Sequence, residues 1–180
     1  MRVITGTARG RRLNTVPGND IVRPTPEKIK EGIFSSIQFD IEGRRILDLF
    51  AGCGQLGIEA LSRGAESAVF IDASDVSISV IKENLEATRL SDKADVIRSD
   101  YLSFLSRTSD TFDIAFLDPP YRAGLLENAL NSVTKVMSDY GIIICEHPSD
   151  IDLPANVNSF SVAKEYRYGS IVVTVYKKGG

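Results

Sequence analysis

A glycine-rich turn between an apolar strand and a helix is the feature that most constrains the fold of this chain. Residues 45–50 predict a short strand, residues 48–57 contain the spacing Gly-x-Gly-x-x-Gly, and a helix is expected over residues 56–62. Another strand is predicted directly afterwards, at residues 67–72. This order of strand, glycine turn, helix and strand is typical of a parallel sheet with helices packed against it.

The remainder of the chain continues the alternation of helices and strands. Thr25 and Pro26 suit the N-cap and first turn of a helix, and Asp75 can cap another that runs to about residue 90. Strands are predicted at residues 95–98, 112–117, 141–146, 159–166 and 171–176, and a helix at 123–137. Short apolar strands separated by helices indicate the doubly wound α/β class. The turn at residues 168–170 is too short for a crossover helix, so the last two strands should form an antiparallel hairpin at the end of a mostly parallel sheet.

Charge is distributed unevenly along the chain. Its 180 residues fit one domain, and the net charge of −3, taken alone, argues against a nucleic-acid partner. Residues 1–30, however, hold seven basic residues against two acidic ones, so they carry +5 and the other 150 residues carry −8. We therefore divide the chain into a basic N-terminal extension, residues 1–24, and an acidic body, residues 25–180. The extension is either a binding segment for phosphates or a solvated terminal segment.

The cysteines and the N-terminus argue against several other classes of protein. Cys53 and Cys145 lie far apart, form no Cys-x-x-Cys pair and are accompanied by a single histidine, so neither a disulfide scaffold nor a metal site is expected. The first residues lack the apolar stretch of a signal peptide, and the longest apolar runs span only a handful of residues. We expect a cytoplasmic protein that does not enter a membrane.

The glycine turn is compatible with a nicotinamide or flavin dinucleotide, with S-adenosylmethionine, or with no ligand, the glycines then serving only a tight turn. Asp48 ends the strand before this turn. A dinucleotide places its pyrophosphate at the N-terminus of the following helix, where a carboxylate would repel it. S-adenosylmethionine carries an ammonium and a sulfonium group, which an aspartate would attract. Gly52 and Gly54 would let such a cofactor approach the backbone closely.

Acids also follow the next two predicted strands. Asp72 suits the ribose hydroxyls of an adenosine cofactor, and Asp100 is placed to accept hydrogens from the adenine amino group. Each acid alone is more often a helix cap or a surface charge. Their succession at the ends of neighbouring strands favours a cofactor site.

The most specific motif of the chain is Asp118-Pro119-Pro120-Tyr121, which follows the fourth predicted strand. Its carboxylate and carbonyl groups should lie at the same edge of the sheet as the glycine turn, and its two prolines have no N–H groups. Such an acceptor-rich edge can hold the hydrogens of an exocyclic amino group while the nitrogen attacks an electrophile. Tyr121 offers a flat face for a stacked base. The competing interpretation is a proline-rich turn with a structural tyrosine.

Together, the glycine turn and the Asp-Pro-Pro-Tyr motif resemble those of S-adenosylmethionine-dependent amino-methyltransferases that act on nucleobases. A closer resemblance is to the bacterial RsmD family, which methylates the exocyclic N2 of a guanine in 16S ribosomal RNA. The matching stretches cover nearly the whole chain: residues 2–6, 9–13, 23–26, 47–65, 116–121 and 168–169. The chain departs from the family pattern at Lys30, Cys53 and Gln55.

The resemblance implies a Rossmann-like methyltransferase fold for the body and a role for each matching residue. Catalysis is implied for Asp118, Pro119, Pro120 and Tyr121. Binding of S-adenosylmethionine, and of its product S-adenosylhomocysteine, is implied for Arg23, Thr25, Asp48, Phe50, Ala51, Gly52, Cys53, Gly54, Asp72, Ala73, Asp100 and Tyr101. Binding of RNA is expected of Arg2, Arg9, Arg11 and Arg12. The expected partner is 16S ribosomal RNA or a small-subunit assembly particle, and we expect a monomer without a metal.

Two other functions remain open from the sequence. The chain could methylate another planar amine, such as adenine N6 in nucleic acid or a protein amide, or it could be a non-catalytic RNA-binding module. Cys53 is expected to contribute its backbone N–H rather than its thiol, because no base is evident nearby. His147 follows the fifth predicted strand and either contacts the substrate or has no functional role.

Overall fold

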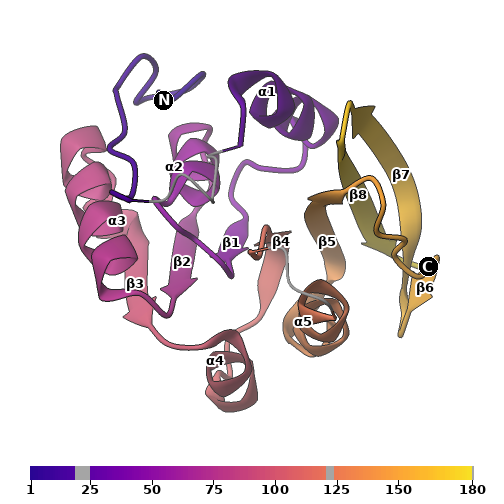
Figure 1. Ribbon diagram of the computed structural model, residues 1–180. Helices are drawn as coiled ribbons and strands as arrows, with labels where there is room; N and C mark the ends of the chain where they lie inside the picture. The colour runs from indigo at the N-terminus through magenta and orange to yellow at the C-terminus, as the bar shows by residue number, and fades with distance from the viewer. Residues whose placement is uncertain (19–24, 121–123, 180) are drawn as a thin grey trace.

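Eight strands form one mixed sheet in the computed structural model, which describes residues 1–18, 25–120 and 124–179 (Figure 1). The strands are β1 (Arg45–Asp48), β2 (Ser67–Asp72), β3 (Ala94–Arg98), β4 (Phe112–Leu117), β5 (Met137–Pro148), β6 (Asn156–Val157), β7 (Phe160–Tyr168) and β8 (Ile171–Lys178). Their order across the sheet is β3-β2-β1-β4-β5-β8-β7-β6. The first five strands in this order, from β3 through β2, β1 and β4 to β5, run parallel. Strands β8, β7 and β6 pair antiparallel with their neighbours. The predicted doubly wound sheet with a terminal antiparallel hairpin is confirmed.

Helices cover both faces of the parallel part of the sheet. They are α1 (Glu27–Ser36), α2 (Gln55–Ser62), α3 (Asp75–Thr88), α4 (Tyr101–Arg107) and α5 (Leu125–Val133), with short 3-10 turns at Ser91–Lys93 and Thr134–Val136. In Figure 1, α1, α2 and α3 lie on one side of the sheet, and α4 and α5 lie on the other. Within the described ranges, no helix is long and apolar enough to span a membrane.

Alternate residues of the central strands supply two hydrophobic cores. Ile46 of β1 and Phe116 of β4 belong to the core on the side of α1, α2 and α3. Leu47 of β1 and Ala115 of β4 belong to the core on the side of α4 and α5. Because both faces are buried, nearly every position of these strands must be apolar, which explains their unbroken apolar runs in the sequence.

The first and third helices begin differently from the prediction. Pro26, rather than Thr25, occupies the N-cap position of α1, and its ring has no group that could form a capping hydrogen bond. The Thr25 hydroxyl contacts Glu146 instead. Ser74, rather than Asp75, caps α3, and its hydroxyl accepts a hydrogen bond from the Ser77 N–H at 3.3 Å. Both predicted helices exist, but their caps were assigned to the wrong residues.

Helix α5 and strand β5 differ in length from the prediction, and helix α4 and strand β6 were not predicted. The helix expected over residues 123–137 ends earlier, because the chain turns into β5 at Met137. Strand β5 spans 12 residues, since β8 pairs along its second half and Met137 pairs with Phe112. Helix α4 was not predicted. It is short and buries only Phe104 and Leu105 among its seven residues, too weak a pattern to detect.

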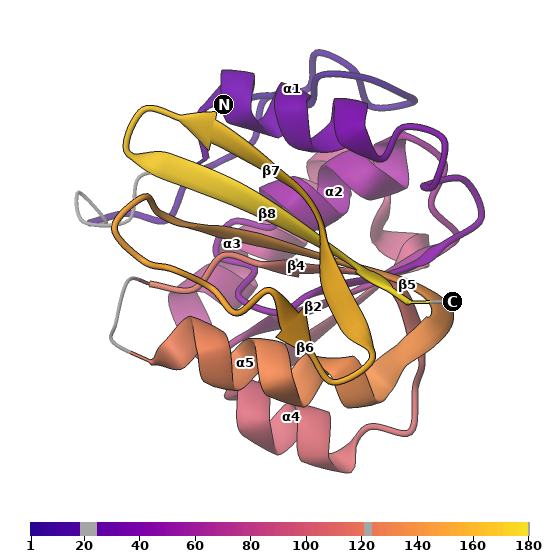
Figure 2. The same ribbon diagram turned by 90° about the vertical axis from the view of Figure 1, so that its right-hand side faces the viewer.

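The C-terminal strands extend the sheet between α1 and α5 (Figure 2). Tyr168, the last residue of β7, packs its hydroxyl against Gly32 of α1 so closely that a Cβ at Gly32 would overlap it. On the other side, the Asn158 amide donates to the Thr134 hydroxyl at 2.7 Å. These contacts hold the hairpin against helices on both faces.

The N-terminal segment, residues 1–14, is packed onto the body. Val3, Ala8 and Leu13 are buried in the core beside α1, α2 and α3. Lys30 of α1 is completely buried, and its ammonium group donates to the Arg2 carbonyl at 2.7 Å. The first residues therefore have a defined place in the fold.

Glu59 of α2 anchors this segment. Its carboxylate accepts hydrogen bonds from the N–H groups of Ile4 and Thr5 at 2.9 and 3.0 Å. It also pairs with Lys30 at 3.2 Å and with Arg63 at 2.9 Å. A buried carboxylate with these partners is well compensated. The side chains expected to bind RNA, Arg2, Arg9, Arg11 and Arg12, are exposed on this packed segment.

Candidate active site

Four acids lie at the carboxyl ends of adjacent parallel strands. Asp48 and Asp72 are the last residues of β1 and β2. Asp118 directly follows β4, and Glu146 lies near the end of β5. Because Leu117 pairs with Cys145, the next residues, Asp118 and Glu146, are neighbours across the two strands. This edge is where ligands of open α/β sheets bind.

Asp48 is buried beneath the glycine turn. Its Oδ2 accepts a hydrogen bond from the Gly57 N–H at 3.0 Å, which fastens the first turn of α2 to the end of β1. Burial raises the pKa of Asp48 from 3.8 to about 7, and the charge of Asp72 adds to this effect. A cation placed beside Asp48 would restore its ionised form.

The backbone of the glycine turn is held by Asp72. Its two carboxylate oxygens accept hydrogen bonds from the N–H groups of Gly52 and Ser74, each at 2.9 Å. Gly52 and Gly54 have positive φ angles of 58° and 80°, a conformation that favours glycine. A Cβ built on Gly52 would meet no atom within 4 Å, so the space above this residue is open.

Asp118 and Glu146 are connected by the hydroxyl of Thr25. Thr25 Oγ1 lies 2.9 Å from Glu146 Oε2 and 3.3 Å from Asp118 Oδ2. Thr25 and Glu146 are buried and Asp118 is half-buried. The pKa of Asp118 is raised well above its ordinary value by burial and by the charges of Glu146 and Asp48. Burial also raises the pKa of Glu146.

Asp100, at the far side of the site, already has a structural role. One of its oxygens accepts a hydrogen bond from the Ser103 N–H at 2.9 Å and caps α4. Hydrogen bonds from the hydroxyl and the N–H of Ser103 lower the pKa of this exposed acid. Next to it, the ring of Tyr101 lies 5.4 Å from the ring of Phe50, centroid to centroid. These two half-buried rings give this end of the site an aromatic wall.

The other predicted site residues differ in how exposed they are. Ala51, Cys53 and Pro119 are buried, and Ala73 and Pro120 are exposed. Arg23 and Tyr121 lie outside the described residues.

The thiol of Cys53 is not activated. Burial raises its pKa, and its carbonyl accepts a hydrogen bond from the Asn84 amide at 2.9 Å.

Sequence reasoning missed Glu146 and considered its neighbour His147 instead. His147 is buried, and its Nε2 lies 2.8 Å from the Thr174 hydroxyl of β8. Residues 146 and 147 point to opposite faces of β5 because side chains alternate along a strand. The position of Glu146, one strand over from Asp118 at the same edge, was the signal that could have found it.

Three acids of the site have no ion-pair partner among the described residues. In the described ranges, no lysine, arginine or histidine forms an ion pair with Asp48, Asp118 or Glu146. In the same part of the chain, no group of three or more potential ligands is placed to hold a metal ion. Buried acids without counter-ions favour a cationic organic ligand.

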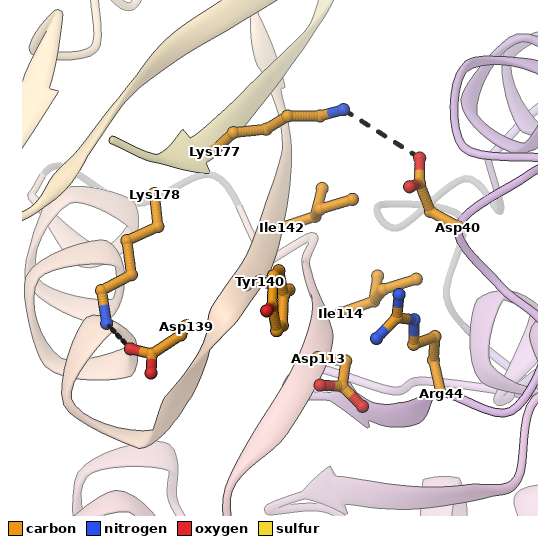
Figure 3. Close-up of a pocket in the computed structure, with 10 residues that line it drawn as sticks. Asp40, Arg44, Asp113, Ile114, Asp139, Tyr140, Ile142, Lys177 and Lys178 are labelled. Carbon is orange, nitrogen blue, oxygen red and sulfur yellow. Dashed lines mark hydrogen bonds and ion pairs between the residues drawn. The ribbon is translucent and has the colours of Figure 1, made fainter. Parts of the chain in front are cut away.

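A pocket at the opposite edge of the sheet has a different character (Figure 3). It is lined by Asp40 and Arg44, which precede β1, by Asp113 and Ile114 of β4, by residues 139–142 of β5, and by Lys177 and Lys178 of β8. Lys177 pairs with Asp40 at 4.0 Å and Lys178 with Asp139 at 2.7 Å. With these charges paired, this pocket lacks the imbalance found at the carboxyl edge.

Comparison with known proteins agrees with this picture. The family described as Conserved hypothetical protein 95 matches residues 1–177. A protein of Bacillus subtilis (strain 168), "Putative rRNA methyltransferase YlbH", is 40% identical over 185 residues, which cover all of both chains. "Ribosomal RNA small subunit methyltransferase D" of Escherichia coli (strain K12) is 34% identical, covering 99% of this chain and 90% of the relative.

A solved structure shares the whole fold. "Putative methyltransferase yhhF from Escherichia coli" superposes with a TM-score of 0.88 at 33% sequence identity, covering 99% of this chain and 97% of that one. The similarity therefore includes the N-terminal segment and the C-terminal hairpin as well as the parallel sheet.

Proposed function

The chain belongs to the RsmD/YlbH family, described as Conserved hypothetical protein 95, and from this premise we propose that it transfers a methyl group from S-adenosylmethionine to a base amino group in ribosomal RNA. The observation that carries the proposal is the position of Asp118 at the carboxyl edge. It lies beside two buried acids, Asp48 and Glu146, that have no ion-pair partner among the described residues, and next to an open glycine turn. A cationic methyl donor and an amine acceptor both suit such a site.

The residues at this edge fit the cofactor. Asp48 would pair with the ammonium group, the turn around Gly52 would accommodate the methionyl part, and Asp72 would bind the ribose. The second oxygen of Asp100 and the rings of Phe50 and Tyr101 suit the adenine. The remaining cofactor contacts that we propose are those of Arg23, Thr25, Ala51, Cys53, Gly54 and Ala73.

The Asp-Pro-Pro-Tyr motif would hold the acceptor. Asp118, as a carboxylate, would accept a hydrogen of the base amino group and orient the nitrogen lone pair toward the methyl carbon. Pro119 and Pro120 carry no N–H that could compete, and Tyr121 would stack on the base. When bound, S-adenosylmethionine supplies an electrophilic methyl group and a neutral thioether leaving group. The amine's proton passes to a nearby carboxylate.

More specifically, we propose N2 of a guanine in 16S ribosomal RNA as the acceptor, presented as free RNA or in a small-subunit assembly particle in the cytoplasm. The relative named small subunit methyltransferase D supports this assignment, and the exposed arginines of residues 1–14 would meet the RNA phosphates. We propose that the monomer is the active form.

Transfer of labelled methyl groups to ribosomal RNA from a strain that lacks the enzyme tests the function. We expect incorporation at one guanine, and a loss of at least about 100-fold in Asp118→Ala because positioning and proton transfer both fail. Asp152→Ala, the same change at an exposed loop acid, should keep wild-type activity.

The acceptor is identified by mapping the modified nucleotide. Label in duplex DNA or in protein instead would assign the chain to another amine. Tight RNA binding without any methyl product would show a binding module, and the proposed function would be wrong.

A further inference from the structure

One hydroxyl group lies between two carboxyl groups in the candidate site. Thr25 Oγ1 contacts Glu146 Oε2 at 2.9 Å and Asp118 Oδ2 at 3.3 Å. A hydroxyl has one hydrogen, so it can donate to only one of these oxygens. The second contact is favourable only if that carboxyl is protonated and donates to the lone pair of Thr25. The geometry therefore accommodates one proton shared by Asp118 and Glu146.

The surroundings of the pair favour this protonated form. From β1 the pair faces Asp48, whose charge opposes ionisation of Asp118. Lys30, the buried lysine of α1, is engaged by Glu59 and by the Arg2 carbonyl. On β5 itself, His147 contacts Thr174 on the opposite face. Burial raises the pKa of both Asp118 and Glu146, and the charges of Glu146 and Asp48 raise that of Asp118 further.

We propose that Glu146 is a positioning residue for the methyl transfer, which shares one proton with Asp118 across the Thr25 hydroxyl and loses it when a cationic methyl donor is bound. The inference rests on the proposed function, which places the positively charged sulfur near Asp118. It gives Thr25, besides its proposed contact with the cofactor, the role of a bridge between the two acids.

The shared proton would connect cofactor binding to acceptor binding. With the positive sulfur nearby, Asp118 becomes the carboxylate that the base amino group needs. In the transfer, the N–C bond forms, the C–S bond breaks with its electron pair on sulfur, and the amine releases one proton. The pair formed by Asp118 and Glu146 takes up this proton while the sulfur becomes neutral. In the product complex, Asp118 and Glu146 again share one proton. Asp118 is then no longer held as the carboxylate that binds the base amino group.

Proton release on ligand binding tests this coupling. Titration calorimetry in two buffers of different ionisation enthalpy, near pH 7, measures the protons released with S-adenosylmethionine and with S-adenosylhomocysteine. Both ligands carry the same ammonium group, so release from Asp48 cancels in the difference between them. We expect the sulfonium ligand to release up to about one proton more than the thioether ligand.

Variants identify the residues that release the additional proton. Glu146→Gln and Thr25→Val should reduce the excess by more than half, and Thr25→Ser, which keeps the hydroxyl, should restore it. Asp139→Asn removes an exposed acid from the other end of β5 and should leave the excess unchanged. Circular dichroism checks that each variant is folded.

Three results would overturn the inference. Equal proton release with both ligands in the wild-type protein contradicts it without reference to any variant. An undiminished excess in folded Glu146→Gln shows that Glu146 does not share the proton. A chain that binds neither ligand contradicts the proposed function and this inference with it, whereas binding with equal release contradicts this inference alone.

Discussion

At the scale of single residues, Asp48 is a buried acid with few stabilising partners. Its carboxyl group is buried with a single hydrogen bond from the Gly57 N–H and without a positive partner among the described residues. Most buried acids in proteins are paired because an isolated charge is costly. At Asp48 that cost appears as a pKa raised to about 7.

This raised pKa predicts how stability varies with pH. The folded state retains a proton on Asp48 between pH 3.8 and about 7, whereas the unfolded chain has lost it. The contribution of Asp48 to stability is therefore present at low pH and is lost as the pH rises from about 4 through about 7. Asp48→Asn should flatten the decline in the free energy of unfolding by up to about 1.4 kcal/mol per pH unit in that range.

Urea unfolding of the wild type and the variant, at several pH values, measures the effect. Asp152→Asn, at an exposed loop acid, should follow the wild-type curve. Parallel curves for Asp48→Asn and the wild type would mean that Asp48 is ionised in the folded protein throughout.

At the scale of elements, β1, the glycine turn, α2 and β2 pack closely together at the carboxyl edge of the sheet. Gly57 lies in the first turn of α2 directly over the ring of Phe70 from β2, and a Cβ at this position would overlap the ring. The same residue donates its N–H to Asp48. The third glycine of the motif therefore allows close contact of helix and strand.

Gly57→Ala should destabilise the protein by about 1–3 kcal/mol, because the added methyl group overpacks the core against Phe70. Chemical unfolding measures the loss. Phe70→Leu shortens the opposing side chain, so the double variant should be more stable than the sum of the two single effects implies. Additive effects would show that the strain arises elsewhere.

At the scale of the whole molecule, the positive and negative charges have separate places. The basic side chains of residues 1–14 are exposed, and the segment itself is anchored by Glu59 and Lys30. The acids at the carboxyl edge are buried or half-buried and lack counter-ions within the described ranges. The net charge of −3 is thus the sum of an exposed basic segment and an acidic body.

Arg9, Arg11 and Arg12 should contribute to RNA affinity through phosphate contacts. Replacing each by alanine should weaken binding of 16S RNA and lower the slope of log affinity against log salt by roughly one per arginine that contacts a phosphate. Filter binding at several salt concentrations measures both quantities. Arg107→Ala, on α4 at the other face of the sheet, should change neither, and unaltered slopes in all three variants would exclude this segment from the RNA interface.

The fold class, the family and the edge of the sheet where the acids gather follow from the amino-acid sequence alone. These depend on short-range patterns: apolar runs, a glycine spacing over residues 52–57, and the motif that begins at Asp118. Only the tertiary structure decided that Thr25 bridges Asp118 and Glu146 rather than capping a helix, since 121 residues separate Thr25 from Glu146. It also decided that the basic N-terminal segment is packed, because buried Lys30 and Glu59 are brought to it by two different helices. Hydrogen bonds between distant residues depend on how the elements pack, and no local pattern in the sequence records that packing.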